Sequence, residues 1–569
     1  MKSLLLLWMN WMQKAAKQMG KIGSAVRAVN ASKGAFALLG MALLFGAILR
    51  FSGVNWGMPD RVDLHPDERM YVIEPALKIA PGALDPGFLN YPNFIHYSIA
   101  AVLGVLRSFG LETTTPLAHQ VGRSILAGYG TLTIGLAWLL AGRLGARRKG
   151  QALAAVWVAI LPLHVWESHI AVTDVMMTFW IMAVLLGALR IARGADDLRW
   201  WVPVLSGVAL GCAVGSKYTA ALSSVALLMG MIYARMPWRR FLLVGIAIGV
   251  SALLACFVVT PYSFLRFGDL LEAMAFEHEH VRGHHLGFST TAPGWQYHKY
   301  VYQLCAAWPF SFGIALYVSV GLGVLWMLWR LSYARSIPLV LAGLLYFVMG
   351  GWTYTPIRYY MPIIVIGAIC AGVWHGALLD GAKRARRAGM VLVLVTLAYT
   401  TWFCVETNAR YGDDTREQAA RWLRTYNGEP MHVAALGSGA YLGHFKGSDV
   451  VTFKVHPEGN AGRLYNEDFD LIQISSLHYL RWLRHGRPDF YGTVYGRIRD
   501  NDANLRLVKR FEDDFPNKRF YGVLDPMFTC LFVSPTLEFY ASSTGADRFG
   551  SMGDAAEVSA AEVSAAESP

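Results

Sequence analysis

The strongest constraint on this chain is a series of long, nearly uncharged apolar stretches. A helix of about 20 apolar residues crosses the roughly 30 Å hydrocarbon core of a bilayer. Eleven stretches are predicted to do so: Ala35–Phe51, Val121–Ala141, Gly150–Trp166, Val175–Leu189, Trp201–Val214, Thr219–Tyr233, Phe241–Val259, Val301–Trp329, Ile337–Met349, Met361–Leu379 and Ala388–Val405. The chain is therefore predicted to be a mainly α, polytopic helical membrane protein.

The composition agrees, because 54% of the 569 residues are hydrophobic and only 16% are charged. Soluble proteins carry about 25% charged residues. The net charge of +12 does not indicate a nucleic-acid partner, because the basic residues gather in short segments between the apolar stretches. That arrangement is typical of membrane orientation. The six cysteines show neither metal-ligand spacing nor a disulfide framework.

These basic clusters orient the chain. They include Lys33 with the lysines before it, Arg143–Lys149, and further groups between later stretches. If every cluster faces the cytoplasm, the chain crosses the membrane an even number of times between successive clusters. Only two spans then fit between Lys33 and Arg143, so Phe94–Leu106 is predicted to lie along the outer interface. The N-terminus is placed in the cytoplasm, and everything beyond Glu406 on the periplasmic or extracellular side of a bacterial plasma membrane.

The predicted organisation has four parts. Residues 1–34 form a basic N-terminus, and residues 35–405 a transmembrane domain with outer loops at 52–120 and 260–300. Residues 406–541 are predicted as a soluble α/β domain, with a helix and four short apolar strands. These elements are Arg416–Leu423, His432–Leu436, Val450–Val455, Asp470–Ile474 and Thr529–Val533. The Ala/Glu/Ser-rich tail, residues 542–569, is predicted to be disordered.

The first candidate site residues are Asp67 and Glu68, in the outer loop after the first stretch. Pro66 favours a helix start at this point. Acidic residues in a first turn can simply complement the helix dipole. An ionised carboxylate beside a hydrophobic slab is costly, however, which favours a functional role. The helix N-terminus should keep Asp67 ionised, as a base or cation ligand requires.

Three further outer turns carry charged candidates. Asp174 begins a span, where it or Thr173 can equally serve as a helix cap. Lys217 follows Gly215-Ser216, where a lysine can snorkel to the interface or act as a point charge for a phosphate. Arg358, followed by Tyr359, offers a planar fork suited to phosphate, or is an interfacial arginine beside tyrosines.

Histidines form a separate group of candidates. The segment Phe276–His285 contains four of them, including His278 and His280, together with acidic residues. Its spacing matches no closed structural metal site, so an acceptor-binding or pH-sensitive loop is favoured over a zinc site. His65 and His169 lie beside the acidic candidates and are considered with this group. A divalent metal ion is left open, and no other cofactor is predicted.

In the order and placement of these motifs the sequence resembles the polytopic GT-C glycosyltransferases. It is most similar to bacterial members of the family 39 group, which contains protein O-mannosyltransferases and aminoarabinose transferases of lipid A. The residues carrying the resemblance are Asp67-Glu68, Asp174, Lys217 and the turn Arg358–Pro362, within residues 35–405. The segment Asp413–Trp422 also resembles a soluble stretch found in some members.

The resemblance implies a GT-C-like fold and a polyprenyl-phosphate-linked sugar as donor. The sugar would be transferred with inversion, at the outer membrane face, to a lipid, glycan or protein acceptor. Asp67, Glu68 and Asp174 would be catalytic, with Asp67 the general base. Lys217, Arg358 and Tyr359 would bind the donor phosphate. A glycolipid or solute transporter is the alternative, although no internal repeat is found. A structural or assembly protein, the third class, would need none of these charges.

Overall fold

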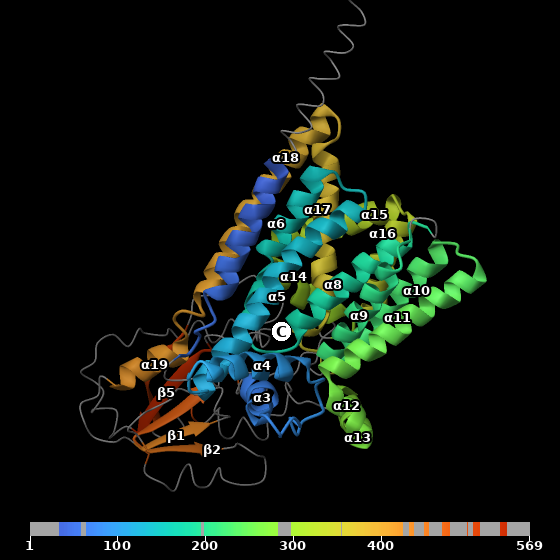
Figure 1. The fold of residues 1–569 in the computed structure, drawn as a ribbon. Coiled ribbons are helices and arrows are strands. Elements are labelled where there is room, and N and C mark those ends of the chain that lie inside the picture. Colours follow the sequence, from blue (N-terminus) through green and yellow to red (C-terminus); the bar gives the residue numbers. More distant parts are fainter. Residues whose placement is uncertain are drawn as a thin grey trace, which may run out of the picture.

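A computed structural model describes residues 34–58, 64–194, 198–282, 298–353, 355–424, 432–436, 449–453, 469–477, 498, 505–512 and 535–542. Most of its residues belong to a bundle of long helices (Figure 1). The predicted basic N-terminus (except residue 34), the predicted tail (except residue 542) and the predicted strand Thr529–Val533 lie outside these ranges.

The described part of the chain has seven helices long and apolar enough to cross a membrane. They are Gly34–Phe51, α5 (Thr115–Arg143), α8 (Asp174–Ile191), α11 (Trp238–Val259), α16 (Tyr333–Gly350), Ile357–Leu379, which contains α17 (Met361–Leu379), and α18 (Lys383–Ala409). Two bent helix pairs raise the number to nine if each pair is one span. The two predicted spans that remain correspond to α9 (Trp201–Ser216) and to Tyr218–Tyr233, which includes α10 (Ser224–Tyr233). Both are apolar helices shorter than 18 residues, so length alone does not establish eleven spans.

Two predicted spans are bent rather than continuous, which corrects the sequence-based expectation. Gly150–Trp166 divides into α6 (Arg148–Ala159) and α7 (Pro162–Trp166), at an angle of 57°. Val301–Trp329 divides at Gly313 into a segment ending with α14 (Trp308–Phe312) and α15 (Ile314–Trp329), at 115°. Gly313 has a φ of 71°, which favours a residue without a side chain.

Arg50 supplies hydrogen bonds to the backbone carbonyls at the bend between α6 and α7. Pro162 has no backbone N–H, so it cannot donate the helical hydrogen bond to the carbonyl of Val158. Arg50 donates instead to Val158 O at 2.8 Å and to Ala159 O at 2.9 Å. Its guanidinium is fully buried and also contacts Nδ1 of His164 at 2.9 Å. The arginine thus satisfies carbonyls that would otherwise be orphaned within a membrane.

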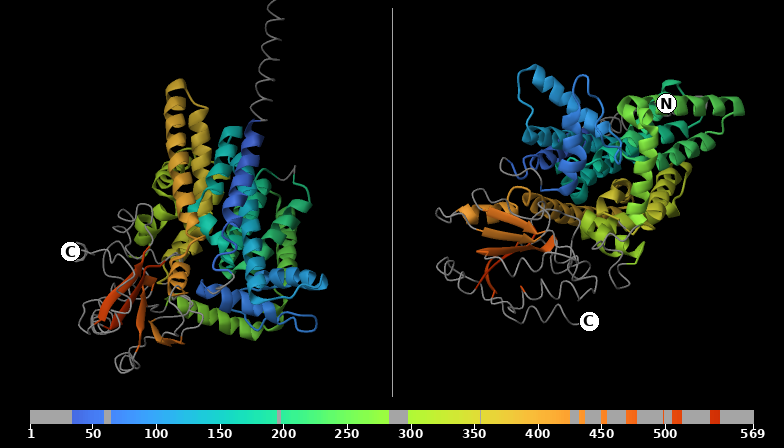
Figure 2. Two further views of the ribbon diagram at one scale, coloured as in Figure 1. Left: turned by 90° about the vertical axis from the view of Figure 1, so that its left-hand side faces the viewer. Right: turned by 90° about the horizontal axis from the view of Figure 1, so that it is seen from below.

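The predicted interfacial segment is a helix, α4 (Phe94–Ser108), that lies crosswise beneath the bundle (Figure 2). It gathers at the lower end of the bundle with α3 (Glu74–Lys78), α12 (Pro261–Leu265), α13 (Phe267–Arg282) and the C-terminal sheet (Figures 1 and 2). Both predicted outer loops and the soluble domain therefore lie at one end of the molecule, as the parity of the basic clusters predicts.

The soluble domain contains α19 (Thr415–Arg424) and a mixed sheet with the strand order β2-β1-β3-β5-β4. Strand β1 (His432–Leu436) pairs in parallel with β2 (Asp449–Phe453) and β3 (Leu471–Ser475). Strand β5 (Leu537–Ser542) runs antiparallel to β3 and to β4 (Leu505–Phe511). The predicted bounds of β1 agree, those of β2 and β3 differ by one or two residues at each end, and β4 and β5 were not predicted. Ala419 and Leu423 of α19 pack in the core beside Phe539.

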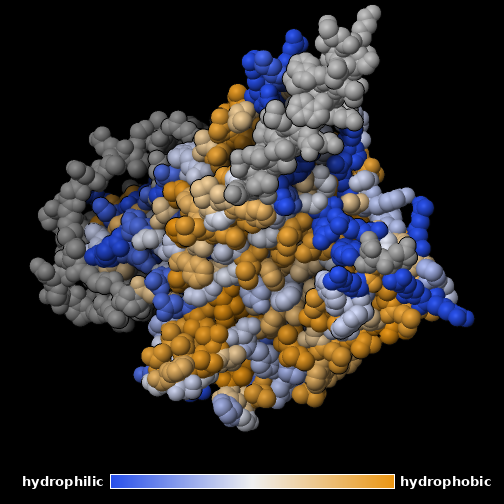
Figure 3. Space-filling model, turned by 45° about the horizontal axis from the view of Figure 1, so that its top comes forward, coloured by the Kyte–Doolittle hydropathy of each residue, from blue (hydrophilic) through white to orange (hydrophobic). Residues whose placement is uncertain are grey.

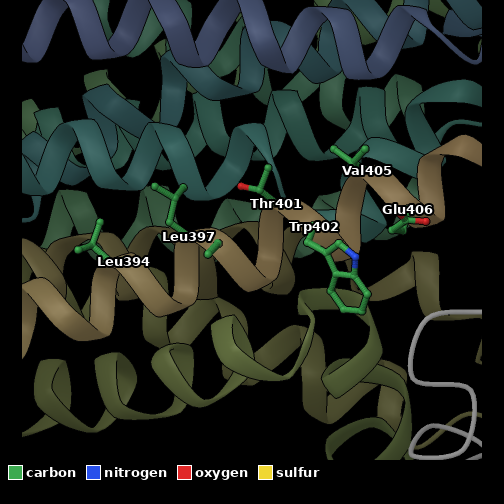
Figure 4. Close-up of a pocket in the computed structure, with 7 residues that line it drawn as sticks. Leu394, Leu397, Thr401, Trp402, Val405 and Glu406 are labelled. Atoms are coloured by element: carbon green, nitrogen blue, oxygen red, sulfur yellow. The ribbon is translucent and has the colours of Figure 1, made fainter.

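Apolar side chains remain exposed along the bundle, as a bilayer-embedded surface requires. Of the most apolar 18-residue stretch of α11, only 11% is buried inside the molecule. Figure 3 shows hydrophobic residues over much of the visible bundle surface. Helix α18 lines a groove of about 640 Å³ with Leu394, Leu397, Thr401 and Trp402, and Glu406 lies at one end (Figure 4). None of the charged candidates from the sequence lines this groove.

The role of Arg50 can be tested with Arg50→Met, which keeps the apolar stem but removes the donors to Val158 and Ala159. Each buried carbonyl left without a partner costs about 1–3 kcal/mol. We therefore expect a clearly lower midpoint of thermal unfolding in detergent. Arg148→Met is the control, because Arg148 is an exposed arginine of α6 that lies over the rings of Phe36 and of Trp138 on α5. Equal midpoints for the two variants would contradict the repair role.

Candidate functional site

A short helix positions Asp67 at the lower end of the bundle. Helix α2 (Pro66–Glu68) begins with Pro66 in its first turn and has His65 as its N-cap. The Nδ1 atom of His65 accepts the backbone N–H of Asp67 at 3.2 Å. Burial lowers the pKa of His65 to about 4, so the ring is neutral and available as an acceptor. His65 thus holds the start of the helix that carries Asp67.

Glu68 turns away from Asp67 into the protein interior. Its two carboxylate oxygens accept bonds from Nε and Nη2 of Arg123 on α5, both at 2.8 Å. Both side chains are fully buried. One oxygen of Glu68 also accepts the backbone N–H of Ala171 at 2.7 Å. Burial raises the pKa of Glu68, but the charge of Arg123 outweighs it and holds this pKa below its ordinary value.

Asp67 belongs to a four-residue ion-pair network with Asp174, Lys217 and Arg358. The guanidinium of Arg358 donates through Nη2 to Asp67, and its Nε lies 3.5 Å from Oδ2 of Asp174. Lys217 donates to Oδ1 of Asp174 at 2.7 Å. The structure therefore brings together four residues that the sequence placed at separate outer turns.

These four side chains are largely removed from water. Their exposed fractions are 18% for Asp67, 2% for Asp174, 15% for Lys217 and 6% for Arg358. Burial raises the pKa of Asp67, but Arg358, His65 and Lys217 together bring it below its ordinary value. Burial lowers the pKa of Lys217, and the facing carboxylate of Asp174 offsets only part of that change.

Tyr359 forms one wall of this network. The Nζ atom of Lys217 lies 3.7 Å from the centre of its ring, and the guanidinium carbon of Arg358 lies 5.7 Å from it. Both distances are within the range of a cation–π interaction. Tyr359 itself is 8% exposed and belongs to the turn that carries Arg358 (Ile357–Tyr360). The ring thus interacts with both cations of the network.

The remaining histidine candidates lie in other surroundings. His169 is fully buried, and its ring contacts Leu49 O at 2.8 Å and packs edge-on against Tyr411. His278 and His280 lie on α13, where His278 is exposed and His280 stacks on Phe276. Among the described residues, no group of three or more His, Cys, Asp and Glu side chains has the geometry of a metal site.

One acidic residue near the network was not selected from the sequence. Glu167 lies in the turn Glu167–His169 between α7 and α8 and is 2% exposed. Its carboxyl interacts electrostatically with Arg358, Asp174, Lys217 and Asp67. The signal was its place seven residues before Asp174, in the same outer turn. It directly follows Trp166, the last residue of the predicted span Gly150–Trp166.

The comparisons with known proteins support a shared architecture. Residues 112–269, which contain Arg123, Asp174 and Lys217, match the family model "Dolichyl-phosphate-mannose-protein mannosyltransferase". The archaeal oligosaccharyltransferase AglB from Archaeoglobus fulgidus, solved with an inhibitory peptide and a dolichol-phosphate, is 14% identical with a TM-score of 0.52. That match covers 89% of this chain and 88% of the other, and shows a common fold.

A second solved structure is ArnT from Cupriavidus metallidurans, bound to undecaprenyl phosphate. It is 17% identical, with 68% of this chain and 72% of the other covered, at a TM-score of 0.45. No curated protein sequence matches this chain.

The contacts of Glu68 give a prediction that separates its role from that of Asp67. Glu68→Gln leaves Arg123 buried without a charged partner, which typically costs about 3–5 kcal/mol. We expect a much lower midpoint of thermal unfolding for this variant. Asp67→Asn is the matched neighbour and should cost less, because Arg358 keeps its pairing with Asp174. A Glu68→Gln protein with wild-type stability but no activity would instead make Glu68 a catalytic residue.

Proposed function

We propose that this chain, a multi-pass membrane glycosyltransferase whose residues 112–269 belong to the dolichyl-phosphate-mannose-protein mannosyltransferase family, transfers a sugar from a polyprenyl-phosphate donor. The transfer inverts the configuration of the sugar, occurs at the outer face of a bacterial plasma membrane, and delivers it to a hydroxyl group of a lipid, glycan or protein. The observation that carries the proposal is the ion-pair network of Asp67, Asp174, Lys217 and Arg358.

The network suits a reaction in which a phosphate leaves. Asp67 takes the proton of the acceptor hydroxyl, and the acceptor oxygen attacks the anomeric carbon on the side opposite the phosphate. The bond between that carbon and the phosphate oxygen breaks, so negative charge develops on the lipid phosphate. Lys217 and Arg358 are the cations beside Asp67 and Asp174, and preorganised charges of this kind stabilise developing negative charge strongly in a buried site.

The contact between Arg358 and Asp67 also supports a change in the proton affinity of Asp67 when the donor binds. The guanidinium of Arg358 is shared between Asp67 and Asp174. A bound phosphate competes for the same donors, which weakens the hold of Arg358 on Asp67. The proton affinity of Asp67 then rises, because an opposite charge close by is what keeps its pKa low. Donor binding thus prepares Asp67 to act as a base.

The first prediction concerns the base. We expect Asp67→Asn to lower turnover by about 10²–10⁴-fold while folding is retained, because the amide cannot accept the acceptor proton. Purified protein, polyprenyl-phosphate sugars and candidate acceptors would be incubated, and donor consumption measured. Asp85→Asn is the control, since Asp85 is a more exposed carboxylate of the same loop paired with Arg266. Equal turnover of wild type and Asp67→Asn would remove Asp67 as the base.

The second prediction concerns the phosphate. Arg358→Ala should weaken binding of the polyprenyl-phosphate sugar by roughly 10–100-fold, as expected when a hydrogen bond to a charged group is lost. Arg358→Lys keeps the charge without the planar fork and should recover part of the affinity. Arg107→Ala is the control, because Arg107 is an exposed arginine at the end of α4. An unchanged donor affinity in Arg358→Ala would exclude the phosphate contact.

A further inference from the structure

The network has balanced charges before Glu167 is counted. Asp67 and Asp174 supply two negative charges, and Lys217 and Arg358 supply two positive charges. Glu167 is a third carboxyl group that interacts electrostatically with all four of them. Were it ionised, it would add an unmatched negative charge to a buried site. A buried charge without a partner is strongly unfavourable, so the neutral acid is the form that this environment favours.

A neutral carboxylic acid brings a hydrogen-bond donor that needs an acceptor. The Oε2 atom of Glu167 is buried and has no hydrogen-bond partner among the described residues. Unpaired buried polar atoms are uncommon in folded proteins and often mark a place where a ligand binds. An acceptor group of a bound ligand can supply this partner.

The position of Glu167 is fixed by its surroundings. The carbonyl of the preceding residue, Trp166, accepts the hydroxyl of Tyr411 at 3.3 Å. Ser168, the next residue, donates its hydroxyl to His164 O at 2.6 Å. Ala171, four residues on, donates to Glu68 at 2.7 Å. The turn is thus held on both sides, so the carboxyl of Glu167 is presented to the network by a rigid backbone.

We infer that Glu167 is a further donor-binding residue, which as a neutral acid donates a hydrogen bond to an oxygen of the polyprenyl phosphate. This inference rests on the proposed function, because it takes the phosphate to be bound between Lys217 and Arg358. A neutral donor suits this place better than a third cation. It holds the phosphate without adding positive charge that would further depress the proton affinity of Asp67. Phosphate oxygens are strong acceptors, and such charge-assisted bonds are among the stronger ones.

The test compares equilibrium binding of a polyprenyl phosphate and of the uncharged polyprenol of the same length. Full-length wild type, Glu167→Gln, Glu167→Leu and the control Glu74→Gln would be used in detergent micelles. Glu74 is a half-exposed carboxylate that pairs with Arg69. We expect Glu167→Leu to lose roughly 10–100-fold in affinity for the phosphate and little for the alcohol. Glu167→Gln should remain close to wild type, because its amide is also a neutral donor.

Three results would overturn the inference alone, and a fourth would overturn the proposed function as well. If Glu167→Gln binds the phosphate as poorly as Glu167→Leu, the residue works as an anion. If Glu167→Leu binds it as well as wild type, Glu167 makes no contact with the phosphate. If Glu167→Leu weakens only a sugar-bearing donor and not the polyprenyl phosphate, the bond goes to the sugar. If wild type itself does not prefer the phosphate to the alcohol, the proposed function fails, and this assignment fails with it.

A second measurement does not depend on the folding of Glu167→Leu. Infrared difference spectra of wild type with and without polyprenyl phosphate should contain a shifted C=O band of a protonated carboxyl group, because its hydrogen bond changes on binding. Glu167→Gln should lack that band, and Glu74→Gln should keep it. A wild-type difference spectrum without a protonated carboxyl band would contradict the inference.

Discussion

The buried pair of Glu68 and Arg123 holds together the parts of the chain that build the site. Arg123 comes from α5 and also donates to the carbonyl of Trp56 at 2.6 Å, while Glu68 accepts the backbone N–H of Ala171 at 2.7 Å. Two charges buried in this way are tolerated only when nearly all of their hydrogen-bonding groups are satisfied. Because Glu68 is anchored, its neighbour Asp67 projects elsewhere, toward Arg358. Because Ala171 is anchored, Asp174 begins α8 at a fixed place beside the same arginine.

The network that results has equal numbers of positive and negative charges, and its cations share their partners. Arg358 is shared by two carboxylates, and Lys217 is shared by Asp174 and the ring of Tyr359. Each of the two cations divides its interactions between two partners, so an entering phosphate competes with both of those partners. The neighbouring cations hold the pKa of Asp67 below its ordinary value, whereas burial lowers the pKa of Lys217 by more than the carboxylate of Asp174 raises it.

Sequence reasoning found the charged residues of the network but not their partners. Parity of the basic clusters placed Asp67, Asp174, Lys217 and Arg358 on one side, and the structure brings them into contact. The sequence favoured Asp67 as the base but could not show that Glu68 is buried, because its partner Arg123 lies 55 positions later. Glu167 directly follows the predicted span Gly150–Trp166, and only Asp174 of the same turn was selected. Strand β4 was missed because Arg506, Lys509 and Arg510 interrupt its apolar residues, and β5 carries Glu538 between Leu537 and Phe539.

Contacts with residues far away in the sequence also explain how the bend at Pro162 is stabilised and where the soluble domain attaches. A proline within an apolar stretch signals a break, but not that Arg50 would supply the lost hydrogen bonds. Trp56, whose carbonyl is bound by Arg123, lies beside the guanidinium of Arg416 and donates to Asp414 at 3.3 Å. Arg416 in turn donates to the carbonyl of Leu64 at 3.0 Å, one residue before His65.

The start of the soluble domain is therefore bonded to the residue that precedes the N-cap of the helix with Asp67. A displacement of α19 also displaces Leu64 or breaks the hydrogen bond from Arg416 to its carbonyl. Breaking that bond is costly because the guanidinium of Arg416 is buried. This places Asp414 and Arg416 within the scaffold of the site rather than in a separate module.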